Sequence, residues 1–466
     1  MKRRKIYCMF FAALFCMLPF DKGTVHAEES WPQGPQIEGE SAVVMEASTG
    51  TVLYEKNPHE QLYPASITKI MTTMLALEHC SLDEEVTFSR ESVFNIDRTS
   101  THISRDVGEI MTMEQCLYAV MLGSANDCAY AVAEHAGKGY ENFIAMMNEK
   151  AGELGCTDTH FNNPHGLPDN EHYTSAYDMA LISRAAIQNE TFRTITGTKR
   201  YTIPFTNKHQ DAETPLVNHH KMLTNYQGET AFLYDYCIGG KTGYTDLARS
   251  TLVTYAEKDD MTLICVVMKE EGNNQYKETR KLLDYCFDNF RLWNVSDQMS
   301  NRLSVDGMDS QIAGTANTEI FGRTQSFADL DKSSCIVLPQ SAVFGDAAYQ
   351  VKEDQGFDIA ASIEFTYAGR GVGSVQIRAT NAQVNQYPFH EMAEDQGSGT
   401  EKIDIPIRYI IFVILVLTAV VLLGMLAYYL IQNIHMMRRT YRVKHRDKKR
   451  FREIKKGRHT KWKTRW

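Results

Sequence analysis

The chain has no closely paired cysteines, although it contains ten cysteines in 466 residues. None of them forms a C-x-x-C pair, so the sequence supports neither a zinc motif nor a redox motif. Cys8 and Cys16 lie in the apolar N-terminal segment. The other eight are scattered, mostly among apolar neighbours, as Cys265 is. This favours buried free thiols, with some disulfides as an alternative in an oxidising exterior.

Positive charge is scarce outside the two ends of the chain. The formal net charge is −9, although residues 438–466 contain 15 Lys and Arg against only Asp447 and Glu453. The rest of the chain is therefore strongly acidic, which argues against nucleic acid as a partner. An acidic surface of this kind is well solvated and indicates no particular substrate by itself.

Long apolar segments are confined to the ends. A basic stretch, the apolar run 6–20 and the small residues around Ala27 predict a signal peptide over residues 1–27, with an uncleaved anchor as the alternative. Tyr409–Ile431 is uncharged over 23 residues, about 34 Å as a helix, and predicts one transmembrane helix. The basic tail 432–466 is then cytoplasmic and contacts membrane lipid. We expect a single-pass protein of the cell membrane with its folded part on the extracellular side.

The region between these ends predicts two domains. Residues 38–295 combine a strand hairpin at 41–55, a glycine-rich turn at 239–243 and strands at 250–255 and 261–269. Helices are expected at 66–79, within 111–155, at 177–188 and at 274–290. This pattern predicts an α/β (α+β) fold with an antiparallel sheet flanked by helices. Short alternating segments then predict a small all-β domain at 298–392, followed by a polar linker at 393–408.

The first of three chemical motifs is an S-x-x-K sequence, Ser66-Ile67-Thr68-Lys69. If a helix begins here, Ser66 lies in its first turn and Lys69 lies one turn later on the same face. A serine needs a base to attack a carbonyl group at neutral pH. Lys69 can be that base only if burial or a nearby cation lowers its pKa.

The second and third motifs are Ser124-Ala125-Asn126 and Lys241-Thr242-Gly243. Ser124 offers a hydroxyl to a leaving nitrogen, and the Asn126 amide can bind a substrate backbone. Lys241 supplies a positive charge for a substrate that ends in a carboxylate, and it is a second cation that can lower the pKa of Lys69. Thr242 offers a hydroxyl to that carboxylate, and Gly243 lets a substrate backbone lie close to the chain.

Each motif alone has an ordinary explanation: a helix cap at Ser66, a turn at Ser124 and a glycine-rich loop at Lys241. Together, in this order and spacing, they favour a catalytic site, and the same triple is typical of β-lactamases and penicillin-binding proteins.

The chain resembles the low-molecular-mass penicillin-binding proteins that act as serine D-alanyl-D-alanine carboxypeptidases. Beyond the three motifs, the resemblance rests on four segments and covers roughly residues 38–290. The segments are 64–72, 147–151, 159–168 and 172–180. It implies the penicillin-binding, β-lactamase-like transpeptidase fold.

The resemblance also implies a mechanism. Lys69 deprotonates Ser66, which attacks the carbonyl between two terminal D-alanines of a peptidoglycan stem peptide. Ser124 relays a proton to the leaving D-alanine, and Asn126 orients the substrate. The terminal carboxylate is held by Lys241 and Thr242, and the oxyanion by the backbone N–H groups of Ser66 and Tyr244. β-Lactams are then covalent inhibitors, and no metal or cofactor is needed.

Three alternatives remain open. A class A β-lactamase needs a glutamate base between motifs two and three, where Glu171 is the nearest glutamate. An endopeptidase that cuts cross-links is a close variant, and a non-catalytic sensor of β-lactams or of the wall is a third possibility. The chain also departs from the family pattern at Ala125 and Arg249, where relatives often have glycine. We interpret His165 and His172 as loop residues and not as members of a triad.

Overall fold

A computed structural model of the chain describes residues 30–298, 317–320, 323–326, 328–330, 333–353 and 359–379. The signal peptide, linker, transmembrane helix and basic tail predicted from the sequence lie outside these residues and remain predictions. Within the described ranges, no helix combines the length and the apolar character that a membrane crossing requires.

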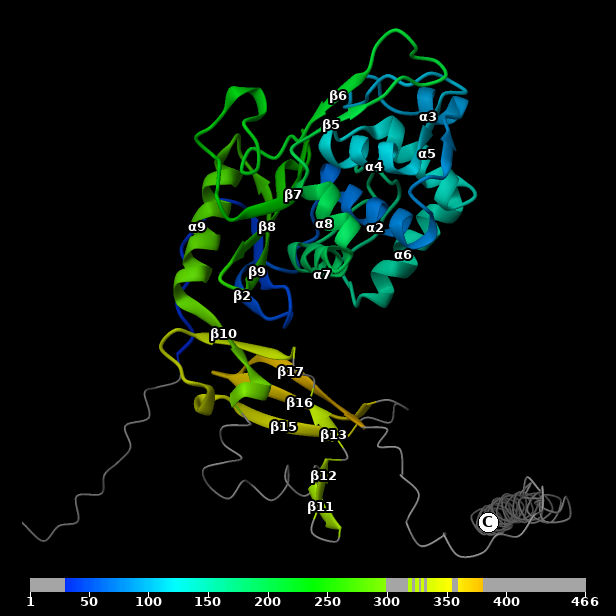
Figure 1. Ribbon diagram of the computed structural model, residues 1–466. Coiled ribbons are helices and arrows are strands. Elements are labelled where there is room, and N and C mark those ends of the chain that lie inside the picture. The colour runs from blue at the N-terminus through cyan, green and yellow to red at the C-terminus, as the bar shows by residue number, and fades with distance from the viewer. Residues whose placement is uncertain are drawn as a thin grey trace, which may run out of the picture. The chain divides into compact units, whose positions relative to one another are not determined.

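A five-stranded antiparallel sheet is the centre of the fold (Figure 1). In spatial order its strands are β2 (Val52–Lys56), β1 (Ser41–Glu46), β9 (Met261–Glu270), β8 (Arg249–Lys258) and β7 (Cys237–Thr245). The predicted hairpin is confirmed as β1 and β2, and the two predicted strands are confirmed as β8 and β9. Because β1 pairs with β9, the first hairpin completes a sheet whose other strands come almost 200 residues later.

The two faces of the sheet pack against different helices. Successive side chains of a strand point to opposite faces, so in β9 Ile264 and Val266 join one core while Cys265 and Val267 join the other. The second core is covered by α9 (Asn274–Asn289), a helix that the sequence predicted. Figure 1 shows α9 on one face of the sheet and the remaining large helices on the other.

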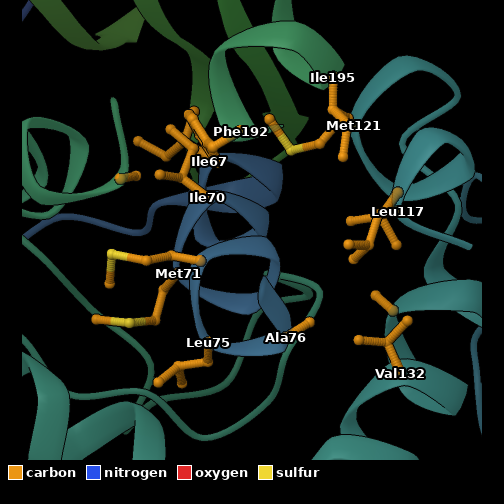
Figure 2. Packing of buried hydrophobic residues seen from close by; sticks show 14 of the residues in the cluster. Ile67, Ile70, Met71, Leu75, Ala76, Leu117, Met121, Val132, Phe192 and Ile195 are labelled. Carbon is orange, nitrogen blue, oxygen red and sulfur yellow. The ribbon is translucent and has the colours of Figure 1, made fainter. Parts of the chain in front are cut away.

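The helices of the first core surround α2 (Lys69–His79), whose first eight residues are all buried. The others are α4 (Met113–Leu122), α5 (Asn126–Ala136), α6 (Tyr140–Glu153), α7 (Ala176–Ile187) and α8 (Glu190–Gly197). Figure 2 shows Ile70, Met71 and Leu75 of α2 among the buried side chains of this core, with Leu117 and Val132 on neighbouring helices. The start of α2 is therefore enclosed by other elements on all sides, and even its polar residues Lys69, Thr72 and Thr73 are buried.

Two sequence-based expectations are wrong in detail. Residues 239–243 are not a turn but the middle of β7, which pairs with β8 from Cys237 to Thr245. The α-helix expected from Ser66 begins at Lys69, after the 3-10 turn η1 (Ala65–Thr68). The Ala65 carbonyl accepts a hydrogen bond from the Thr68 hydroxyl at 2.9 Å. We attribute the tighter turn to this bond, because it competes with the α-helical bonding of that carbonyl.

Short elements that the sequence did not predict frame the helical part. They are the strand pairs β3 (Glu85–Thr87) with β4 (Ile110–Thr112) and β5 (Arg200–Ile203) with β6 (Thr214–Val217), the helix α3 (Arg90–Phe94) and the 3-10 turn η2 (Tyr226–Gly228). Three-residue and four-residue strands carry too little alternation to stand out in a sequence.

The described residues after 298 form strands and one 3-10 turn, η3 (Phe344–Asp346). One sheet has the order β13 (Ala328–Leu330), β17 (Arg370–Ala379), β16 (Ile359–Tyr367), β15 (Ala348–Glu353). β14 (Cys335–Pro339) pairs with β10 (Phe290–Asn294), and β11 (Asn317–Ile320) pairs with β12 (Arg323–Ser326). The predicted all-β character of this region agrees with these strands, while its boundaries remain a prediction.

We expect Leu117→Ala to lower the free energy of unfolding by about 2–5 kcal/mol, because the Leu117 side chain is fully buried among the helices around α2. Urea denaturation measures the change. The matched control is Leu247→Ala, at a leucine that is 55% exposed, which we expect to change stability by less than about 0.5 kcal/mol. Equal losses in the two variants would contradict the packing described here.

Candidate active site

The first motif lies where the 3-10 turn η1 meets helix α2. Ala65 adopts a left-handed conformation with φ of 50°, and Ser66 follows at the surface of the core. The Ser66 hydroxyl lies 2.9 Å from Lys69 Nζ, as the spacing of the motif predicts. A left-handed non-glycine residue is uncommon, and such residues cluster at functional sites.

The Lys69 side chain is fully buried and has three oxygen neighbours. Besides Ser66 Oγ, its Nζ donates to Asn126 Oδ1 at 2.6 Å and to the His165 carbonyl oxygen at 2.7 Å. Burial holds the pKa of Lys69 well below its usual range, and the positive charge of Lys241 lowers it further, while Asp127 acts in the opposite direction. These surroundings favour the neutral amine.

The loop that contributes the His165 carbonyl is packed tightly beneath η1. Gly166 has φ of 87°, and a Cβ at this position would overlap the Ala65 carbonyl oxygen. Thr72, one turn into α2, donates to the Pro164 carbonyl at 2.6 Å. The loop therefore touches both the turn that carries Ser66 and the helix that begins with Lys69, which makes its glycine a requirement of close approach.

The second motif occupies the connection between α4 and α5. Ser124 has φ of 56° and is only 5% exposed. Asn126 is the first residue of α5, and its side chain bridges Lys69 to Ser100, to whose hydroxyl it donates at 2.8 Å. The predicted turn after the apolar segment is thus confirmed, and it brings Asn126 to the amine of the first motif.

The third motif lies in β7, at the edge of the sheet nearest to η1. Lys241 Nζ donates to Ser124 Oγ at 3.0 Å and to the Thr242 carbonyl at 2.8 Å. A Cβ on Gly243 would lie 2.8 Å from the Ser66 backbone nitrogen, so this glycine lets the strand pass against the turn that carries Ser66. Thr242 is half-buried, and Tyr244 is 61% exposed.

Lys241 is buried as completely as Lys69, with only 1% of its surface exposed. Burial lowers its pKa from 10.5 to about 7. Near neutral pH, Lys241 therefore lies at the midpoint of its titration. The structure thus brings the three motifs together in two hydrogen-bonded groups. Lys69 contacts Ser66 and Asn126, and Lys241 contacts Ser124.

A buried histidine links the Ser66 turn to a distant loop. His172 Nδ1 accepts the Asn162 backbone N–H at 2.9 Å, so its Nε2 carries the proton and lies 2.9 Å from Thr68 Oγ1. Burial lowers the pKa of His172 to about 3, which keeps this ring neutral. The imidazole donates to Thr68, whose hydroxyl donates to Ala65. His172 thus supports the turn and does not contact Ser66, in agreement with its interpretation as a loop residue.

Arg249, one of the two departures from the family pattern, and Glu171 both lie at the surface. Arg249 has φ of 53°, a conformation that favours glycine, and its side chain pairs with the exposed Glu271 at 3.3 Å. Glu171, the glutamate considered for a β-lactamase reaction, is exposed to solvent. The loop instead presents the His165 carbonyl to the site.

Sequence reasoning missed Ser100 and the contribution of the His165 backbone. Ser100 lies in the loop between α3 and β4, which has no periodic pattern and no motif. A backbone carbonyl carries no residue-specific signal, so only the fold can identify it. Thr68 was visible inside the first motif, but its bond to His172 spans 104 residues.

Comparison with known proteins agrees with this geometry. Residues 27–272 match the family model of D-alanyl-D-alanine carboxypeptidases of the S11 peptidase family. The chain is 36% identical over 262 residues to the D-alanyl-D-alanine carboxypeptidase DacF of Bacillus subtilis, a match that covers 54% of this chain and 63% of DacF. It is 31% identical to the D-alanyl-D-alanine carboxypeptidase of Streptomyces sp. strain K15, over 54% of this chain and 88% of that protein.

Solved structures give the same result. The crystal structure of the Streptomyces K15 DD-transpeptidase is 29% identical, with a TM-score of 0.50 over 55% of this chain and 100% of that one. Penicillin-binding protein 5 from Haemophilus influenzae covers 75% of this chain and 98% of its own, with a TM-score of 0.57. At 24% identity, the second likeness concerns the fold alone. The family match spans more than half of the chain, and the chain belongs to the S11 family of D-alanyl-D-alanine carboxypeptidases.

Proposed function

We propose that this protein removes the terminal D-alanine from peptidoglycan stem pentapeptides through an acyl-enzyme on Ser66. The observation that carries this proposal is the contact set of Lys69. A neutral amine has two N–H groups and one lone pair, and two of its neighbours, Asn126 Oδ1 and the His165 carbonyl, can only accept. The lone pair is then left for the Ser66 hydroxyl at 2.9 Å, which is the arrangement of a base and its nucleophile.

In the first step, Lys69 takes the Ser66 proton as Oγ attacks the carbonyl carbon between the two D-alanines. The backbone N–H groups of Ser66 and Tyr244 are proposed to stabilise the oxyanion, because β7 passes against the turn at Gly243. Ser124 then donates a proton to the leaving nitrogen and takes one from Lys241, whose Nζ lies 3.0 Å from the Ser124 hydroxyl. The proton that Lys69 took from Ser66 replaces the one that Lys241 gave. Water hydrolyses the acyl-enzyme in the last step.

Asn126, Lys241 and Thr242 are proposed to bind the substrate. Asn126 orients the peptide backbone, and the Lys241 charge with the Thr242 hydroxyl selects a free terminal carboxylate. β-Lactams, whose amide resembles the D-alanyl-D-alanine end, acylate the same serine. Release of a bound β-lactam is slow in this proposal because the adjoining loop presents a carbonyl and not a carboxylate base.

The sequence supports a topology for this activity. We propose that residues 1–27 direct export and that 409–431 span the cell membrane. The catalytic domain (38–295) and the β domain (298–392) then lie outside, while the basic tail contacts lipid on the cytoplasmic side. The support is the basic and apolar pattern of both ends and the substrate, which is extracellular.

Replacing the nucleophile tests the reaction directly. We expect Ser66→Ala to reduce D-alanine release from a stem pentapeptide by on the order of 10⁴-fold or more and to abolish covalent labelling by a fluorescent penicillin. Release is measured by a coupled D-alanine assay on the full-length protein in detergent. Ser48→Ala, at an exposed serine outside the site, should retain full activity.

An absence of release by the folded wild type would overturn the carboxypeptidase proposal. Cross-linked stem-peptide dimers added in parallel then separate the remaining functions. Cleavage of the dimer would indicate an endopeptidase, whereas penicillin labelling without cleavage of either substrate would indicate a sensor.

The titration of Lys241 predicts a pH dependence. The depressed pKa of about 7 means that Lys241 is charged below pH 7 and neutral above it. We expect kcat/KM for a peptide with a free carboxylate to fall as pH rises above about 7, approaching tenfold per pH unit. A pH profile with the free and the C-terminally amidated peptide measures this, since the amide needs no cation.

Lys241→Arg is the matched variant for this profile. A guanidinium stays charged throughout, so the alkaline fall should disappear even though the planar head group lowers absolute activity. An unchanged alkaline fall in this variant would assign the titration to another group.

A further inference from the structure

The two helices that begin in the active site end beside each other at a second cluster of polar side chains. α2 begins with Lys69 and is capped at its C-terminal end by Cys80. α5 begins with Asn126 and has His135 in its last turn. Glu84, in the loop after α2, completes the cluster. One ligand atom from each of Cys80, Glu84 and His135 lies within 4.8 Å of the other two.

The donor atoms of this cluster are those that zinc prefers. Thiolate sulfur, imidazole nitrogen and carboxylate oxygen are its common protein ligands, and sites with three such ligands and an open fourth position are frequent. A thiolate disfavours magnesium and calcium, which take oxygen ligands. All three side chains are partly exposed, which leaves an entry path for an ion.

Two features of the fold prepare this position for a cation. The C-terminal ends of α2 and α5 both carry the partial negative charge of a helix dipole, and both end at the cluster. The Ser81 backbone N–H donates to Glu84 Oε1 at 2.7 Å, which holds the carboxylate with Oε2 at 2.8 Å from His135 Nε2. An outer contact of this kind orients a metal ligand before the metal arrives.

The distances require only small side-chain movements. Metal–ligand bonds of about 2.0–2.3 Å in a tetrahedron separate the ligand atoms by about 3.3–3.6 Å. The Glu84–His135 contact, at 2.8 Å, would therefore open by about 0.5 Å. The Cys80 sulfur already lies within 4.8 Å of both atoms.

A second cluster, Asp106 with Glu109 and His209, is less suited to binding a metal ion. The Glu109 carboxylate is fully buried and already accepts from the Arg105 guanidinium at 2.8 Å. It also accepts from the Asp106 backbone and from Thr206. A protein cation thus occupies the place that an ion would need.

We propose that Cys80, Glu84 and His135 bind one divalent cation of the zinc class. The thiol proton is released to solvent, and the proton on His135 Nε2 moves to Nδ1, which leaves the Nε2 lone pair for the ion. The site is structural and distinct from the catalytic centre. It lies about 16 Å along α2 from Lys69, and the ion joins the far ends of the two helices that carry Lys69 and Asn126. No spacing motif marks it, because its third ligand follows the second by 51 residues.

Zinc binding to the full-length protein tests this proposal. The protein in detergent, with a non-thiol reductant, is titrated with Zn²⁺ alone against a chromophoric chelator. We expect one equivalent at micromolar or tighter Kd and a rise in Tm of several degrees at saturation. Co²⁺ in place of zinc should give a thiolate-to-metal charge-transfer band. Cys80→Ser and His135→Gln should each weaken zinc binding by at least about tenfold and remove the Tm rise.

Three matched variants serve as controls. Cys156→Ser replaces another half-buried cysteine, His79→Gln replaces the exposed histidine next to Cys80, and His209→Gln removes the histidine of the second cluster. All three should bind zinc as the wild type does. The proposal is overturned by wild-type protein without stoichiometric zinc, by a cobalt spectrum without the thiolate band, or by zinc loss in His209→Gln alone. If a variant fails to fold, thiol labelling of the wild type decides the matter, because bound zinc should protect Cys80 from the reagent.

Discussion

The chemistry of this site depends on the burial of two amines. Lys69 and Lys241 are both withdrawn from water, and within the part of the chain that the structure describes neither forms an ion pair with a carboxylate; both donate to neutral oxygens instead. Moving an ammonium group from water into a protein interior is costly, so the fold lowers both pKa values. Because burial destabilises the charged form of each amine, Lys69 can act as a base and Lys241 can lose its charge near neutral pH.

The burial of these amines depends on elements that are far apart in sequence. Helix α2 carries Lys69 into the centre of a helical core, and β7 brings Lys241 from the edge of the sheet. The loop after Phe161 covers Lys69 from a third direction, where the His165 carbonyl accepts from its amine. His172, from the same loop, holds the turn that carries Ser66 through its bond to Thr68. Because these elements together bury the two amines, both titrations depend on correct tertiary packing.

The sequence was most informative where chemistry and periodicity coincide. Strands β1, β2, β8 and β9 of the central sheet, helices α4, α7 and α9 and the three motifs were visible, because apolar alternation and reactive side chains mark them locally. Strand β7 was not, because its glycines were interpreted as a turn. The detail at Ser66 and at Gly243 was not visible. A 3-10 turn differs from the start of an α-helix only in which backbone carbonyls its N–H groups reach, and here the Thr68 hydroxyl occupies the Ala65 carbonyl. A sequence does not distinguish a glycine that lets two backbone segments pack closely from a glycine that makes a turn.

The loop at His165 contributes a backbone carbonyl oxygen to the site. A substitution of His165 therefore does not replace this oxygen with another group. Antibiotic-destroying relatives need a carboxylate at this place. Changing residue 165 alters a buried side chain and leaves its carbonyl where it is, while Gly166 beside it has no room for even one carbon. A carboxylate base therefore cannot be introduced at position 165 or 166 without a change in the path of the loop backbone.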